Sequence, residues 1–510
     1  MKKIIIICFI LLSVKGYAQS LTDSLYLYQQ SGNVLSGAQQ NANFLLVTPV
    51  NLSGKITLDY DYSNGGFRKA QQAHITHQAG LVSEGFNKFG RFETTGYFKF
   101  ARIWQDSLSW TTKGLEQDDQ PYYYGSVKAG SYERFKYELG GILSYNLIKN
   151  KVYLATGLNY LYNSATRSVD PRPQVNTYQF QIKPEVLYRF GKGIIGINAL
   201  WGYGTETMGI SYKNIGYRGG GYPDRINYLV QGYGYYTKSQ NENPLKRLDK
   251  QYGLGLTYTI SFADYHLRAA IGYKTILEDN YKDLDQSVRK SYVSFYDTEK
   301  YDAFLQMDKK NKNIQQQLQL TYNQQQSNDV NIVFYAINYK YSAQNFNLQY
   351  LISLDHFNKK TNEFGLNLNY NHLNKHDIAT QHRLKYTLFE PNLLYNAYLN
   401  FKNNDRLKLG LQLGYRTPLQ NELSIDPLQI NIFTHDVIFP DYQFYSSNAL
   451  KTSVSVHYIT ANLFKNFRSA ITADADFYRQ LAVKNQLSDY SFNQVGKNFI
   501  SCNLGLNIYF

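Results

Sequence analysis

Alternation of apolar and polar residues with a period of two runs through most of the chain and limits what it can fold into. In residues 407–415 every second residue is Leu or Tyr, and the residues between them are Lys, Gly and Gln. Residues 254–262 and 364–370 follow the same pattern. Because successive side chains of a strand point to opposite faces, each segment predicts a strand with one apolar and one polar face.

Two all-β architectures produce such strands. A soluble β-sandwich packs its apolar faces against each other in domains of about 100 residues. Here roughly twenty segments follow one another without a linker, which favours a transmembrane barrel with apolar faces toward lipid and polar faces toward the lumen. We therefore predict an all-β fold, a transmembrane antiparallel β-barrel formed by residues 53–510.

The composition excludes several other classes. The 510 residues include two cysteines, too few for a disulfide scaffold. The longest apolar run, Ile4–Leu12, is shorter than a membrane-spanning helix requires. Charged residues make up only 18%, and aromatic residues reach 16%, with 49 tyrosines. The aromatic residues fit the girdles of a membrane barrel, and the general strand preference of Tyr and Phe explains them equally well.

The first eighteen residues have the features of a secretory signal peptide. Lys2 and Lys3 precede the apolar run, and small residues at Gly16 and Ala18 fit a cleavage site. We predict cleavage after Ala18 and a location in the cell outer membrane. A soluble periplasmic or secreted enzyme is the alternative interpretation of the same leader.

The last strand and the loop lengths allow the strands to be counted. Residues 500–510 alternate strictly and end on Phe510, which is typical of the final strand of outer-membrane barrels. Even strand number, short periplasmic turns and long outer loops predict about 20 strands, within a range of about 16 to 22. The long outer loops are predicted at residues 105–130, 167–173, 214–250, 418–448 and 482–495. Short turns include one at residues 342–345.

The polar faces indicate what lines the lumen. In the first half of the chain they carry charges of both signs, at Asp59, Asp61, Glu93, Lys99, Arg134, Lys136, Glu138, Lys183, Glu185 and Arg189. In the second half they are mostly amides, such as Gln317, Gln319, Asn367 and Asn396. A single-sign ring would indicate an ion-selective pore, whereas mixed signs brace the wall or hold an inserted segment. Residues 19–52 are predicted to be either a periplasmic segment or a small lumen insert.

Several short motifs lie between about residues 120 and 236. They are Gln120-Pro121-Tyr122-Tyr123, Tyr137-Glu138-Leu139-Gly140-Gly141, Asp170-Pro171-Arg172-Pro173 and Gly219-Gly220-Gly221-Tyr222. With the leader and the terminal Phe510, this arrangement resembles an uncharacterised family of outer-membrane β-barrel proteins from Bacteroidetes, marked by the Asp-Pro-Arg-Pro loop. The resemblance implies a fold and a location, and no activity.

Candidate binding residues lie in the predicted outer loops. Arg172, Tyr217, Tyr222 and Arg225 could present a cation and aromatic rings to a surface ligand. The alternative is structural, because the two prolines stiffen the strand exit and the glycines form a turn. No catalytic residues, cofactor or metal are predicted. His372 and His376 flank a predicted periplasmic turn and are interpreted as surface imidazoles rather than ligands.

Two functions remain open from the sequence. One is a channel or transport-related barrel for small polar solutes, based on the amide-lined half of the lumen. The other is a non-conducting accessory subunit of an outer-membrane uptake complex, using its long Tyr-rich loops for recognition. A barrel hydrolase is a third and weaker hypothesis. Expected partners are outer-membrane lipids, the barrel assembly machinery, and a transporter or surface lipoprotein; no basic stripe indicates nucleic acid.

Overall fold

The computed structural model describes residues 34–48, 51–114, 119–218, 221–239, 243–284, 289–311, 313–356, 359–402, 405–464, 467–484, 487 and 490–510. The predicted signal peptide, residues 1–18, lies outside this part of the chain. Among the described residues no helix is both long enough and apolar enough to cross a membrane.

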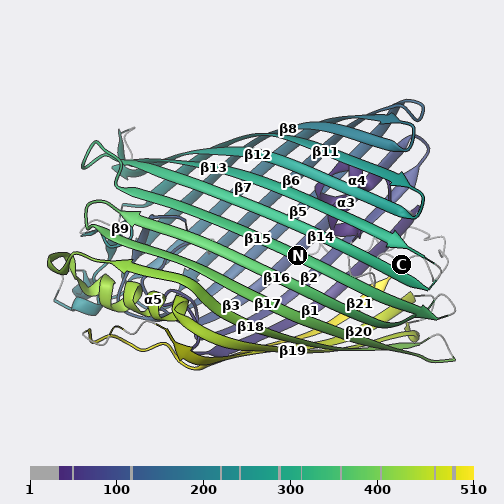
Figure 1. The fold of residues 1–510 in the computed structure, drawn as a ribbon. Helices are drawn as coiled ribbons and strands as arrows, with labels where there is room; N and C mark the ends of the chain where they lie inside the picture. Colours follow the sequence, from purple (N-terminus) through teal and green to yellow (C-terminus); the bar gives the residue numbers. More distant parts are fainter. Residues whose placement is uncertain are drawn as a thin grey trace.

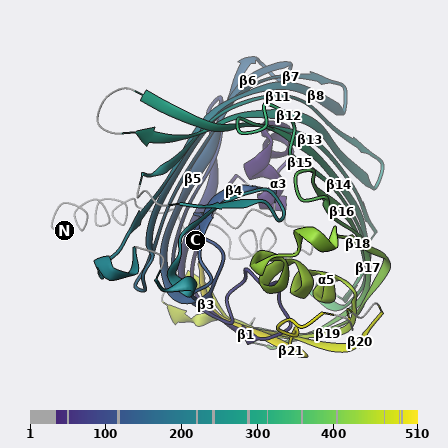
Figure 2. The same ribbon diagram turned by 90° about the vertical axis from the view of Figure 1, so that its left-hand side faces the viewer.

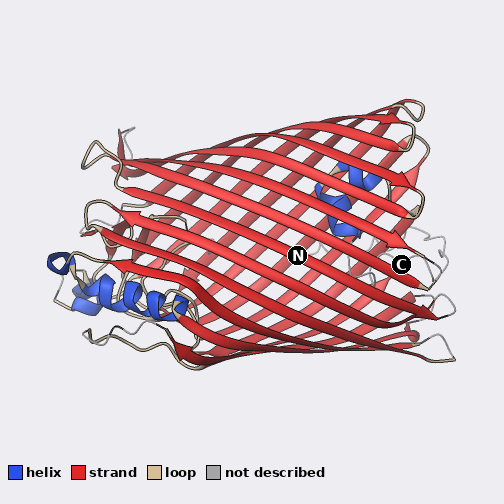
Figure 3. Ribbon diagram, in the orientation of Figure 1, coloured by secondary structure: helices blue, strands red, loops and turns tan. Residues whose placement is uncertain are grey.

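The chain forms a closed antiparallel barrel of 18 strands (Figures 1 and 3). The first strand pairs with the last, Lys55–Gly65 lying against Phe499–Tyr509, so that the sheet has no free edge. The wall strands are β1 Leu52–Gly65, β2 Ile75–Phe89, β3 Phe92–Leu108, β5 Gly130–Ile148, β6 Val152–Arg167, β7 Arg172–Phe190, β8 Gly193–Ser211, β11 Leu245–Phe262, β12 Tyr265–Leu284, β13 Arg289–Lys310, β14 Ile314–Asn331, β15 Tyr339–His356, β16 Lys359–Asp377, β17 His382–Asn400, β18 Arg406–Ser424, β19 Ser447–Phe464, β20 Phe467–Val483 and β21 Asn498–Tyr509.

The all-β barrel class agrees with the sequence prediction, whereas the strand number of about 20 is too high by two. β15 runs unbroken through residues 342–345, where a turn was predicted, and Ala343 and Asn345 stay in register with β16. β17 is likewise one continuous strand where the strand count placed two, because β16 pairs with Glu390 and Pro391, whereas β18 leaves these two residues unpaired and resumes pairing at Asn392. His372 and His376 therefore lie inside β16 rather than beside a periplasmic turn.

The strands are long, and their alternation sets the two faces of the wall. Lengths range from 12 residues in β21 to 22 in β13, more than the about 10 residues that a tilted strand needs to cross a bilayer. Outward apolar side chains are exposed, with Leu254 at 65% and Ile197 at 63%. Inward neighbours such as Asn198 and Thr257 are buried. The apolar positions of the predicted alternation thus face the outside of the barrel, and the polar positions face the lumen.

One end of the barrel is filled by the long loops. β4 (Tyr122–Gly125), β9 (Tyr228–Gln231) and β10 (Tyr236–Lys238) form a small antiparallel sheet, although residues 214–250 were predicted as one outer loop. The helix α5 (Phe439–Tyr445) lies beside this sheet within the ring of strands (Figure 2). We call this assembly the outer plug. Its core is strongly aromatic and includes Trp110, Tyr122, Tyr124, Tyr228, Phe433 and Tyr442.

The other end holds two short helices, α3 (Val34–Gln40) and α4 (Ala42–Leu46). They lie inside the barrel, close to the end with the short turns (Figures 1 and 3). Ala38, Ala42, Leu45 and Leu46 pack against wall residues including Tyr153 and Leu187. We call residues 34–48 the inner segment. The lumen is therefore occupied at both ends by parts of the same chain.

Candidate functional site: a polar chamber in the lumen

The inner segment is held by hydrogen bonds from its middle. Asn43 is fully buried, and its amide nitrogen donates to the Ile194 carbonyl and to Thr257 Oγ1, both at 3.1 Å. The Asn43 carbonyl oxygen accepts from Thr259 Oγ1 at 2.8 Å. Since a buried amide without partners is costly, these three bonds fix Asn43 to β8 and β11.

Two predicted lumen residues, Lys183 and Glu185, also contact the inner segment. Lys183 Nζ donates to the Gln40 carbonyl and to Asn41 Oδ1, the latter at 3.2 Å. Glu185 accepts from the Ala42 backbone N–H at 3.3 Å and from Thr257 Oγ1 at 3.0 Å. These polar contacts add to the packing of Phe44, Leu45 and Leu46, which are buried against the wall. The segment is thus seated by both polar and apolar contacts.

The outer plug is also tied to itself and to the wall by specific bonds. Trp110 Nε1 donates to Asp436 Oδ2 at 2.8 Å, which joins two loops more than 300 residues apart in sequence. Tyr122 donates to Asp329, whose other oxygen accepts from the Asn338 and Tyr339 backbone N–H groups at 2.7 Å. Burial raises the pKa of Tyr124 to about 12, so its hydroxyl stays protonated and donates to the Asn243 carbonyl at 2.8 Å.

A buried ion network fastens the plug at a third place. Arg247 lies 3.2 Å from Glu206 and 3.6 Å from Glu278, and all three side chains are almost inaccessible. Gln120, from the loop that leads into β4, donates to Glu278 at 2.9 Å. Removing one member of such a network leaves an uncompensated buried charge. Arg247 was not predicted as a lumen residue, because residues 214–250 were expected to form one outer loop; in the structure β11 already begins at Leu245.

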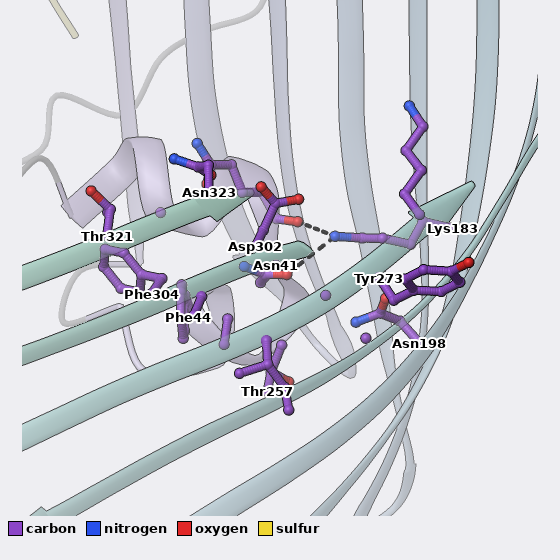
Figure 4. A pocket seen from close by; sticks show the side chains of 18 of the residues that line it. Asn41, Phe44, Lys183, Asn198, Thr257, Tyr273, Asp302, Phe304, Thr321 and Asn323 are labelled. Atoms are coloured by element: carbon purple, nitrogen blue, oxygen red, sulfur yellow. Dashed lines mark hydrogen bonds between the residues drawn. The ribbon is translucent and has the colours of Figure 1, made fainter. Parts of the chain in front are cut away.

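Between the two closures lies a chamber of about 680 Å³. Figure 4 shows the side chains around it: Lys183 reaches toward Asn41, and the rings of Phe44 and Phe304 lie beside each other. The two ring centres are 5.7 Å apart. The polar members of the remaining lining come mainly from β8 and β11 to β15, and include Asn198, Thr257, Lys274, Asp302, Gln306, Gln319, Thr321, Asn323 and Gln349. They alternate with glycines and apolar residues such as Leu200 and Ala303.

The chemistry of this chamber is that of a binding cavity. Amides and hydroxyls both donate and accept hydrogen bonds, so the lining can replace the water around a polar solute. Charges of both signs face the space, with Lys274 on β12 and Asp302 on β13 near one another in the ladder. Within the described part of the chain no group of three His, Cys, Asp or Glu side chains is arranged to hold a metal.

The other predicted lumen residues form short-range contacts along the wall. Lys99 and Lys136 both pair with Glu138, at 3.7 and 2.5 Å. Arg134 donates to Gln105 and to two carbonyls of the outer plug, at Lys113 and Gly114. The remaining members are also engaged: Asp61 accepts from Gln78 and Asn503, Asp59 is adjacent to Asp61, Glu93 pairs with Lys88, and Arg189 lies over the Tyr153 ring.

The four predicted surface-loop residues meet around Asp170. Arg172 Nε donates to Asp170 Oδ1 at 2.8 Å, and Arg225 donates to the Asp170 carbonyl at 3.2 Å. Arg225 also lies 4.1 Å from the centre of the Tyr217 ring, which contacts Tyr222 edge-on. Burial acts to raise the pKa of Asp170, but the Asn214 and Lys213 N–H groups and Arg172 hold it below its ordinary value. Whether this cluster binds a ligand stays a proposal.

The chain belongs to a family described as "Family of unknown function (DUF6850)", whose profile matches residues 44–510. The matched range covers the whole barrel and the second half of the inner segment. A search of curated proteins finds no match.

Solved structures similar in fold are large outer-membrane barrels. The ferric preacinetobactin receptor BauA of Acinetobacter baumannii is 9% identical, with a TM-score of 0.38 over 90% of this chain and 80% of that one. Pyoverdine-bound FpvA of P. aeruginosa is 8% identical, with a TM-score of 0.43 over 91% and 72%. The FrpB iron transporter of Neisseria meningitidis is 9% identical, with a TM-score of 0.40 over 91% and 82%. Such low similarity carries no information on ligand or mechanism.

Proposed function

We propose that this protein is an outer-membrane barrel that passes small polar solutes through a gated lumen. The observation that carries the proposal is the chamber of about 680 Å³ beside the inner segment, lined in part by amides, hydroxyls and charged groups. The exposed apolar side chains of the wall support a location in a membrane. The predicted signal peptide implies export, which supports the outer membrane as that location.

In this proposal the inner segment is the gate. It is only two short helices long, its apolar contacts are confined to one small cluster with the wall, and water can replace its polar anchors once the segment moves. The outer plug is the more firmly built closure because it has an extended aromatic core and a buried ion network. A solute would be held in the chamber when both closures are in place, and released inward when the inner segment leaves.

Planar-bilayer conductance of the purified protein tests this proposal. We expect a small or rare conductance for the native protein and a clear rise when deletion of residues 34–48 is combined with Val230→Asp, because the deletion removes the inner closure and the buried carboxylate disrupts the sheet of the outer plug. A combined variant that still migrates as a folded barrel in unboiled SDS samples provides the control. If the folded combined variant remains as silent as the native protein, and liposomes that contain it take up no polar solute, the gate and the transport role are both wrong.

A non-conducting accessory role is the second candidate, supported by the loop at residues 332–338. This loop exposes Val333 at 61% and Tyr335 at 84%, together with Phe334 and Ile337. Its backbone is held by Asn331, whose side chain accepts from the Val333 N–H at 2.8 Å. Rigid exposed apolar side chains mark contact sites for other proteins. Recovery of one stoichiometric partner from native membranes, lost in Tyr335→Ser, would favour this role.

A further inference from the structure

A hollow of about 620 Å³ lies among the outer loops and shares no lining residue with the chamber. We call it the surface hollow. The loop after β6, the first residue of β7 and the loop after β8 form it, and the last of these includes the short turns η1 (Ile215–Tyr217) and η2 (Pro223–Arg225). Its volume is within the range of about 300–1,000 Å³ that is typical of small-molecule sites.

The charged groups that line the surface hollow are Asp170, Arg172, Lys213 and Arg225. The Asp170 carboxylate is buried, and it pairs with Arg172 at 2.8 Å while it accepts two backbone N–H groups of the loop after β8. Lys213 and Arg225 have no carboxylate partner in the part of the chain that the structure describes. Asp224, which precedes Arg225, is paired with Lys128, and residues 219 and 220 of the same loop are glycines without a charged side chain.

The two guanidinium groups are held in place and keep donors for a ligand. Arg172 uses Nε to bind Asp170, which leaves its two terminal nitrogens. Arg225 uses one terminal nitrogen for the Asp170 carbonyl, and its guanidinium lies 4.1 Å from the centre of the Tyr217 ring. The Tyr212 hydroxyl donates to the Arg225 carbonyl at 3.1 Å and fixes the backbone there. A guanidinium that is positioned in this way suits carboxylate and phosphate groups, because its planar fork matches two of their oxygens.

The rest of the lining fits a sugar ring better than a bare anion. Ser168 and Asn214 are exposed, and a hydroxyl and an amide both donate and accept hydrogen bonds, as the hydroxyl groups of a sugar do. Ile215 is 71% exposed, and together with the half-buried Tyr217 it offers apolar surface to the carbon face of a ring. Cations, neutral polar groups and apolar surface thus meet in one hollow.

We propose that the surface hollow binds an acidic saccharide, whose carboxylate or phosphate group is held by Arg172, Lys213 and Arg225. The ligand would join the loop after β6 to the loop after β8 at the outer end of the barrel. Lys213 and Asn214 are exposed, so the ligand is reached from the solvent and not through the lumen. The proposal therefore does not depend on transport, and binding can be measured in a protein that conducts nothing.

The test is calorimetric titration of the full mature protein in detergent with glucuronate and, separately, with glucose 6-phosphate, at constant ionic strength. We expect saturable binding of at least one of them, and the tighter ligand identifies the charged group. Affinity should fall at least about ten-fold in Arg225→Gln, a loss of about 1.4 kcal/mol. Lys340→Gln is the matched control, because Lys340 is an exposed lysine at the start of β15 and does not line the hollow. Its affinity should equal that of the native protein.

Two further arms keep the test decisive. Lys213→Gln should weaken binding several-fold, and it replaces Arg225→Gln if the latter no longer migrates as a folded barrel, because the Lys213 side chain is exposed. Glucose tests the need for the charge and sulfate tests the need for the sugar, and neither should displace the acidic saccharide at equal concentration. The proposal is overturned if neither acidic sugar binds saturably, if both variants bind as the native protein does, or if glucose or sulfate competes as well as the acidic sugar itself.

Discussion

Single side chains decide where the loops and the inner segment sit, and Asp170 is the clearest case in the surface loops. Its carboxylate accepts from the Lys213 and Asn214 N–H groups at 3.1 and 3.0 Å and from Arg172. These bonds join the loop after β6 to the loop after β8. Asp170 thus holds Arg172 through its carboxylate and Arg225 through its backbone carbonyl, and Arg225 in turn lies over the Tyr217 ring.

We predict that Asp170→Asn loosens residues 212–218. The pKa of Asp170 is lowered in the folded protein, so its stabilising contribution is present above its ordinary value near 4 and is lost as pH falls through the folded value. Hydrogen exchange of residues 212–218 at pH 7 should be several-fold faster in the variant, and the difference should shrink below about pH 4. Glu133→Gln, which removes an exposed ion pair with Arg102, is the control and should leave this segment unchanged.

A second prediction concerns Asn43 in the inner segment. Asn43→Leu removes three hydrogen bonds and leaves Thr257, Thr259 and the Ile194 carbonyl facing an apolar side chain. The cost is about 1–3 kcal/mol for each buried group left unpaired. Maleimide labelling of Ala38→Cys, in a Cys502→Ser background, measures release of the segment because Ala38 is fully buried. Labelling should be slow when Asn43 is retained and clearly faster when Asn43→Leu is added; equal rates would show that Asn43 is not an anchor.

At the scale of elements, the outer plug is a small folded unit inside the barrel. Its sheet joins β4 to β9, with Tyr123 opposite Val230, and its core is continuous with α5. Because the wall strands are closed by their own hydrogen-bonded ladder, we expect that the plug can be disrupted while the barrel remains intact.

We predict this separation for Val230→Asp. The substitution places an unpaired carboxylate in the fully buried centre of the plug sheet. Limited proteolysis should cut the outer loops faster in the variant, while its unboiled SDS mobility stays that of the native barrel. Ile215→Asp is the matched control, since Ile215 is 71% exposed and should tolerate the charge. Loss of the folded barrel in Val230→Asp would show that plug and wall form one cooperative unit.

Period-two alternation was sufficient to predict the wall but not the plug. Alternation indicates which face of a strand is turned toward lipid, and that property depends only on neighbouring residues in the sequence. It also identified Lys183 and Glu185 as inward residues, although it gave no information on their contacts with Gln40 and Ala42. The plug depends on pairs such as Trp110 with Asp436, whose sequence separation leaves no local pattern. The miscounted strands have the same origin, because β17 continues past Pro391 through its pairing with β16, which leaves no local signal in the sequence.

At the scale of the whole molecule, closure of the sheet predicts a resistant barrel. All 18 wall strands have two hydrogen-bonded neighbours, so the sheet has no unpaired edge at which detergent could begin to unfold the barrel. In SDS gels the unboiled protein should migrate differently from the boiled protein, and membrane fractionation should require detergent for extraction. Extraction in a detergent-free periplasmic fraction would contradict a membrane barrel.

The pairing of β1 with β21 has a consequence for biogenesis. Thr57 donates to Asn507 at 2.6 Å, across 450 residues of sequence. Closing so long a loop carries a high entropic cost and makes slow folding the expectation. Without β21 the sheet would have two unpaired edges and could not close. A copy that lacks this strand should therefore remain an open sheet that is prone to aggregation.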